Sequence, residues 1–186
     1  MFEKKRMICL VPIGEVEEDI IFHLGRGIRE VFPLFQVRIE KVIPLPQQAY
    51  EKRRGQFKAE VILETISQLK LKEAEKILGV VDVDLYANGL NFVFGQAIYG
   101  GRDALISLFR LKNSLYGLVE DKNIYRLRAL KEAIHELGHT FGLSHCPHIK
   151  CVMHFSNSII DTDYKEKDFC KRCLASLSFY FFTSSP

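Results

Sequence analysis

The chain has 186 residues, of which 47% are hydrophobic and 26% charged, with only 12 Gly and 6 Pro. This composition suits one compact domain spanning residues 1–186, and it excludes disordered, collagen-like and low-complexity proteins. Lys and Arg (26) barely exceed Asp and Glu (23), giving a net charge of +3 spread along the chain without dense basic blocks, so we expect no nucleic-acid partner. No apolar run approaches the roughly 18 to 20 residues of a membrane span, so we expect no membrane partner either.

The first apolar run, residues 7–11, is short and is followed by Pro12 and several acids instead of a small-residue cleavage site. We interpret it as a strand, with Cys9 as part of the core. Without a secretion signal the simplest location is the cytoplasm, where thiols stay reduced. The five cysteines are therefore candidates for metal ligands or free thiols first, and for disulfides second.

Strands and helices alternate in the first half of the chain. Apolar residues at helical spacing predict two helices, at residues 20–31 and 52–70. β-Branched and apolar runs bounded by Gly, Pro and Asn predict five strands, at residues 7–11, 36–42, 78–85, 92–98 and 104–111. The alternation passes into consecutive strands, which predicts an α/β fold with a mixed sheet and helices packed on it.

A third helix is predicted before Gly142, which can adopt the left-handed conformation that ends a helix. Asp121 and Asn123 are both candidates for its N-cap. Its apolar residues are spaced three or four apart: Ile124, Leu127, Leu130, Ile134, Leu137 and Phe141.

Residues 144–173 show no clear period, although they hold four of the five cysteines. We expect residues 1–142 to form an N-terminal subdomain and residues 143–186 to form a small C-terminal subdomain. Because the latter segment shows no pattern of core residues, we expect interactions other than a hydrophobic core to order it. In it, Asp161 and Asp163 are expected to be turn residues. The aromatic tail at residues 179–182 is expected to pack on the body of the protein.

The segment HELGHTFGLSHC carries the chemistry. His135 and His139 project about 40° apart on one helix face, so both imidazoles can bind one ion. A sharp turn at Gly142 would return His145 as a third ligand. Three histidines leave the fourth zinc position open for water, as in a catalytic site, and Glu136 is placed to act as general base. The alternatives are polar residues on an amphipathic helix and a catalytically dead zinc site.

The residues HExxHxxGxxH match the metzincin clan of zinc metallopeptidases, in which a Met-containing turn lies beneath the metal. The chain resembles one branch of this clan, the archaemetzincins, in three further features. These are the cysteine directly after the third His, the CxM at Cys151 to Met153, and the CxxC near the C-terminal end. That signature has about seventeen residues between the Met and the CxxC, and this chain has sixteen. The FVFG sequence at 92–95 and the RGQF sequence at 54–57, placed at the start of the second helix, fit the resemblance.

This resemblance implies a compact metzincin-like α/β/α domain with a twisted mixed sheet, a backing helix and an active-site helix. Residues 92–98 would form the antiparallel edge strand to which an extended peptide adds. Met153 would be the Met-turn residue. Some metzincins place a Tyr two residues after this Met to assist the oxyanion, but here the residue is Phe155, so a second donor must come from elsewhere. Some relatives are credited with aminopeptidase-like activity.

The four clustered cysteines suit a second, structural zinc. Their spacing ends in a CxxC pair, and four thiolates complete a tetrahedral shell. The alternatives are two disulfides or a redox CxxC. The four residues are Cys146, Cys151, Cys170 and Cys173.

The sequence therefore predicts a monomeric zinc metallopeptidase with two Zn²⁺ ions and a peptide or protein substrate. His148 and His154 are expected to face solvent or to support the ligands from behind. A non-hydrolytic, zinc-stabilised protein that binds peptides or partners is the main alternative, and a thiol-based redox or zinc-storage module is a third.

Overall fold

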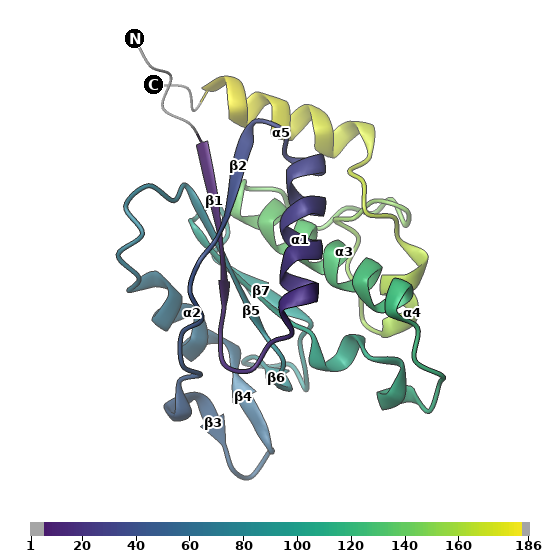
Figure 1. The fold of residues 1–186 in the computed structure, drawn as a ribbon. Coiled ribbons are helices and arrows are strands. Elements are labelled where there is room, and N and C mark those ends of the chain that lie inside the picture. Colours follow the sequence, from purple (N-terminus) through teal and green to yellow (C-terminus); the bar gives the residue numbers. More distant parts are fainter. Residues whose placement is uncertain (1–5, 184–186) are drawn as a thin grey trace.

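The computed structural model describes residues 6–183, with side chains described through residue 181. Three layers are visible in Figure 1, with helices α1 and α3 on one face of a five-stranded sheet and α2 on the other. The strand order is β2-β1-β5-β8-β7; β7 alone runs antiparallel within this sheet and lies at one edge. The mixed sheet and the α/β class are confirmed. The strands are β1 (Arg6–Pro12), β2 (Phe35–Ile39), β5 (Lys76–Val81), β7 (Gly95–Ala97) and β8 (Asp103–Ser107).

The two faces of the sheet bury two separate apolar clusters. The larger lies under α1 and α3 and continues to the cysteines of the C-terminal segment. The smaller lies under α2. Among the described residues, no helix combines the length and apolar character needed to cross a membrane. The helices are α1 (Glu18–Val31), α2 (Ala59–Ser67), α3 (Lys122–Thr140), α4 (Ile159–Tyr164) and α5 (Lys171–Thr183).

The predicted second helix was too long. Its first residues form a turn and a short strand, because Gly55 adopts a left-handed backbone (φ 66°) and Gln56 donates its side-chain amide to Asp84 (3.1 Å) and to the carbonyl of Asn91 (3.0 Å). The RGQF sequence therefore precedes α2. The second small sheet consists of β3 (Tyr50–Glu51), β4 (Gln56–Lys58) and β6 (Leu85–Tyr86).

Four predicted strands were also too long, and the first of them, 36–42, ends at Ile39 of β2. The run 78–85 divides between β5 and β6, and the run 104–111 ends in a 3₁₀ turn at Phe109–Leu111. Of the run 92–98, only Gly95–Ala97 forms a strand, β7. Phe94 and Ile98 each make one further backbone hydrogen bond to β8, and the chain then turns through Gly100 and Gly101. The antiparallel edge strand exists, but it is three residues long.

The C-terminal segment holds two helices that the sequence pattern did not predict. Asp161 is not a turn residue: it completes a capping box with Ser158 at the start of α4. Asp163 is in α4 as well, and its carboxylate accepts from Nε (2.6 Å) and Nη2 (2.7 Å) of the buried Arg128. Helix α5 lies across the end of the sheet where β1 begins (Figure 1), and Phe181 packs on Phe35 as expected for the tail. The side chain at position 182 lies outside the described residues.

Candidate active site

Helix α3 presents the HExxH residues, and its two ends are well defined. Asp121 is the N-cap, since its carboxylate accepts from the backbone N–H groups of Asn123 (2.8 Å) and Ile124 (3.0 Å). At the other end Gly142 takes φ 81°, and the N–H of Leu143 donates back to the carbonyl of Gly138. This reversal returns the chain toward α3 and brings His145 back beside the helix.

Three imidazoles converge at this end of α3. The ring centres of His135, His139 and His145 lie 4.7 to 5.3 Å apart, and their nearest ring nitrogens all lie within 4.8 Å of one another. Nδ1 of His135 faces the carbonyl of Val152 at 2.8 Å, and Nδ1 of His139 faces that of Leu143 at 2.7 Å. A carbonyl oxygen only accepts, so both Nδ1 atoms carry the proton and both Nε2 atoms present a lone pair.

Those two Nε2 atoms are 3.1 Å apart. Two lone pairs at this distance repel each other unless a cation lies between them, and a tetrahedral zinc with bonds of about 2.0 Å holds its nitrogens about 3.3 Å apart. Burial lowers the pKa of His135 well below its usual value and also lowers the pKa of His139 and of His145, which keeps the rings neutral. The residues present therefore fit a three-histidine zinc site.

Glu136 lies against β7, within the same cleft as the histidines. A Cβ atom at Gly95 would lie 2.6 Å from Glu136 Cγ and 2.8 Å from Oε1, so only glycine allows this approach. Burial raises the pKa of Glu136 well above its usual value, the neighbouring Glu132 raises it further, and Lys165 lowers it. The cleft has a volume of about 480 Å³ and lies between β7 and the turn after Met153.

Met153 lies beneath α3, at the position expected of a Met-turn. It is fully buried, and its sulfur packs directly on Gly138, where a Cβ would overlap it. The backbone carbonyl of Met153 accepts from the N–H of Cys146 (2.9 Å). The turn is thus tied both to the helix of the motif and to the segment that carries His145.

The four clustered sulfurs come together as the sequence predicted. Cys146 Sγ lies 3.7 Å from Cys170 Sγ, and Cys151 Sγ lies 3.7 Å from Cys173 Sγ. All four are free thiols within 4.8 Å of one another, and a tetrahedral zinc with bonds of about 2.3 Å would space its sulfurs about 3.8 Å apart. A hydrogen bond from the Cys173 backbone lowers the pKa of Cys170 to about 7, whereas burial raises the pKa of Cys173. The geometry fits a closed four-thiolate site.

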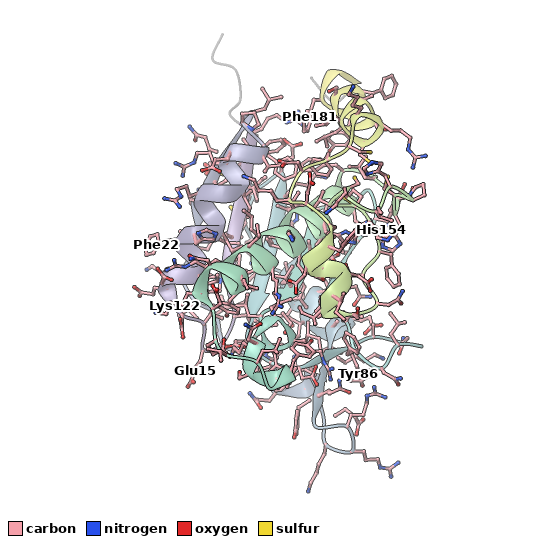
Figure 2. All side chains as sticks on the ribbon, turned by 90° about the vertical axis from the view of Figure 1, so that its right-hand side faces the viewer. Glu15, Phe22, Tyr86, Lys122, His154 and Phe181 are labelled. Carbon is pink, nitrogen blue, oxygen red and sulfur yellow. The ribbon has the colours of Figure 1, made fainter. Side chains whose placement is uncertain are left out.

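The remaining candidates lie outside these two groups. His154 Nδ1 forms a hydrogen bond with the carbonyl of Cys146 (2.9 Å), so His154 supports from behind the segment that carries His145 and Cys146. Figure 2 shows His154 on the opposite side of the molecule from Phe22 of α1. His148 offers its backbone carbonyl to the N–H of Cys151. Cys9 is fully buried in β1, as expected of a core residue. Phe155 packs its ring on His145 with 4.8 Å between ring centres, and it supplies no donor.

Comparison with known proteins agrees with this arrangement. Residues 16–178 match peptidase family M54. The chain belongs to the archaemetzincins. It is 46% identical to the archaemetzincin of Methanocaldococcus jannaschii (91% of this chain, 92% of that protein) and 47% identical to that of Pyrococcus furiosus (92% of each). The crystal structure of the archaemetzincin of Methanopyrus kandleri superposes with a TM-score of 0.86 at 40% identity, covering 96% of this chain and 97% of that one.

This archaemetzincin is therefore a zinc metallopeptidase with the metzincin-type fold that the motif implied. Two residues of its cleft region escaped the sequence analysis. Glu132 is buried and lines the cleft one helical turn before Glu136, and Lys165 Nζ lies 2.9 Å from its Oε1. The spacing of four from Glu136 was a signal for Glu132, but no local pattern indicates Lys165, which lies thirty-three positions further along.

Proposed function

We propose that this archaemetzincin hydrolyses peptide bonds in the cleft between β7 and α3, with His135, His139 and His145 as zinc ligands and Glu136 as general base. The observation that carries the proposal is the pair of Nε2 lone pairs 3.1 Å apart, each fixed by a carbonyl behind its ring, with a carboxylate beside them. When bound, zinc would polarise the scissile carbonyl and lower the pKa of a water molecule to about 7.

The chain's own groups supply the rest of the reaction. Glu136 takes the proton of the attacking water and passes it to the leaving amine. Its burial favours the protonated form, but Lys165 and a dication at the histidines both favour the carboxylate that a base requires. The outer edge of β7 offers backbone groups with which an extended peptide can pair, and this orients the substrate along the cleft.

The second part of the proposal is a structural zinc held by the four cysteines, making two ions per chain. Cys146 directly follows His145, and Cys151 is two residues before Met153. An ion there would brace the backbone that carries the third histidine and the Met-turn. The proposal keeps one catalytic domain, with residues 143–186 as its zinc-braced part.

The finer expectations from the sequence belong to the same proposal. They are aminopeptidase-like cleavage, a monomeric state, a cytoplasmic location and no nucleic-acid or membrane partner. The free thiols support a reducing compartment. Cleavage of matched peptides with free and acetylated N termini tests the first expectation, and light scattering tests the second.

The deciding experiment compares Glu136→Ala with wild type and with Glu166→Ala, which changes an exposed carboxylate in the C-terminal segment. Glu136→Ala should retain both zinc ions while cleavage of any substrate peptide falls about 100-fold or more. Glu166→Ala should cleave as wild type does. Equal cleavage by Glu136→Ala would overturn the assignment of the base. Peptide binding without cleavage by zinc-loaded wild type would favour the non-hydrolytic alternative.

A further inference from the structure

Glu132 is a buried carboxylate that neither the zinc site nor the proton transfer uses. It is 3% exposed and lines the active-site cleft. At three residues before His135 and four before Glu136, its side chain leaves α3 between theirs, about one turn nearer the N terminus. A substrate bound at the histidines therefore places a flanking group close to Glu132.

Both protein partners of this carboxylate approach the same oxygen. Thr162 Oγ1 donates to Glu132 Oε1 at 3.2 Å, and Lys165 Nζ lies 2.9 Å from it. No described residue donates a hydrogen bond to Oε2. Since an ionised carboxylate can accept about four hydrogen bonds, Oε2 is the atom left for a group that enters the cleft.

Lys165 stands behind the carboxylate and does not line the cleft. Its side chain is 0% exposed, and it sits on the segment after α4, which packs beside α3 in Figure 1. A buried charge is costly unless it is paired, so Lys165 stabilises Glu132 as an anion. The cleft thus presents a negative oxygen, while the compensating positive charge stays out of a substrate's reach.

A second polar atom in the cleft also lacks a partner. Ser156 Oγ is buried without a hydrogen bond, in the turn that forms the wall opposite β7. Buried polar groups without a partner are uncommon in folded proteins, and they are expected where a ligand completes the bonding. The Ser156 hydroxyl can donate or accept a hydrogen bond and the carboxylate of Glu132 accepts, so both line the cleft with bonding capacity that a ligand can use.

We infer that Glu132 is a specificity residue that accepts a cationic group, an ammonium or guanidinium, of the peptide substrate. The cation has two sources, the side chain of a Lys or Arg flanking the scissile bond, or the free α-ammonium of the N terminus. The inference rests on the proposed function, because it names the substrate class of the same cleft. It assigns Glu132 to substrate recognition and gives it no part in the chemical step.

The test uses the zinc-loaded chain and four peptides of one sequence: lysine or norleucine beside the scissile bond, each with a free or acetylated N terminus. Wild type should show a higher kcat/KM for the cationic member of one pair. Glu132→Gln should reduce that preference about 10- to 100-fold, since a hydrogen bond to a charged group contributes about 1.5–3 kcal/mol. If the preference lost in Glu132→Gln is that for lysine over norleucine, the cation is the side chain. If it is that for the free over the acetylated N terminus, the cation is the α-ammonium.

A double variant and a binding measurement separate a folding defect from a change in specificity. If Glu132→Gln fails to fold with Lys165 unpaired, the double variant Glu132→Gln/Lys165→Met removes both charges and should lose the same preference. Binding of the four peptides to Glu136→Ala measures selectivity without cleavage, so failure of the general base and failure of the inference are distinguishable. A preference for cationic peptides unchanged in the Glu132 variants, or an equal loss for all four peptides, would overturn the inference.

Discussion

The sulfur of Met153 packs against Gly138 so closely that no Cβ fits between the turn and α3. Alanine normally stabilises a helix interior relative to glycine by about 1 kcal/mol. At position 138 the added methyl group would overlap Met153 and also approach Phe169 to 3.3 Å.

Gly138→Ala should therefore lower stability by about 1–3 kcal/mol, the usual cost of overpacking a core. Gly25→Ala in α1 is the matched control, because the nearest atom to its Cβ is a side-chain carbon of Ile39 at 3.6 Å, an ordinary contact. Urea unfolding of the zinc-loaded proteins measures the stability of both variants. If Gly138→Ala is as stable as wild type, the turn that carries Met153 can move away from α3 without lowering the unfolding free energy.

A second prediction separates the two metal groups. Cys173→Ser should lose one zinc ion and lower the melting temperature, since a structural zinc contributes its binding free energy to folding. His139→Ala should lose the other ion with a smaller effect on stability. Cys9→Ala is the control, because Cys9 is a core residue of β1 far along the chain from the cluster, and it should keep both ions.

Native mass spectrometry counts the ions in each variant. A wild type with one zinc, or with a mass four protons lower from two disulfides, would contradict the four-thiolate site. So would Cys173→Ser with full zinc content and unchanged thermal stability.

The three-histidine group was predictable because its information is local. A spacing of four places His135 and His139 on one face whatever the rest of the fold, and a glycine after the helix is a recognised reversal. The extent of the strands was not predictable, because the length of a strand is decided by its pairing with its neighbours, and β7 pairs with β8 over three residues only. Helix α4 escaped notice because it has only six residues, too few to show an apolar period. The aromatic residues near the end of α5 were interpreted as a tail instead of as part of a helix.

Lys165 illustrates the same limit for the site. Its neighbours in sequence are charged and polar, so the pattern indicates a solvated segment. Its burial depends on a carboxylate of α3 that only the tertiary fold brings to 2.9 Å. Pairing of this kind between distant segments has no signature in a single sequence.

A third prediction concerns Lys76, which joins β5 to the C-terminal end of α3. Its ammonium donates to the carbonyls of Gly101 and Thr140, at 2.7 Å each. Burial lowers the pKa of Lys76 from 10.5 to about 8. Between these values the unfolded chain binds more protons than the folded one, so this group makes stability rise with pH from about 8 to 10.5.

Lys76→Met should lack this contribution. The unfolding free energy of wild type minus that of the variant should therefore increase across this pH range, although the variant also loses the two bonds to carbonyls at every pH. Urea unfolding at pH 7, 8, 9 and 10 gives the difference. Parallel curves for the two proteins would show that the carbonyls hold the ammonium charged despite its burial.

The last prediction concerns the contact between β7 and the proposed base. A Cβ at Gly95 would meet the backbone oxygen of Leu105 at 2.7 Å as well as the side chain of Glu136. The carbonyl belongs to the neighbouring strand and cannot rotate away, so Gly95→Ala must either displace β7 or turn Glu136 out of position. The zinc ligands lie on other elements and should keep the metal.

Gly95→Ala should therefore retain its zinc while peptide hydrolysis falls about 100-fold, the scale expected when a catalytic group is misplaced by about 1 Å. A double-mutant cycle with Glu136→Ala tests the cause. If the methyl group acts by displacing the carboxylate, adding Gly95→Ala to Glu136→Ala should lower the residual rate little further. Fully additive losses in the two variants would instead show that Gly95 matters for how β7 binds the peptide, with Glu136 left in place.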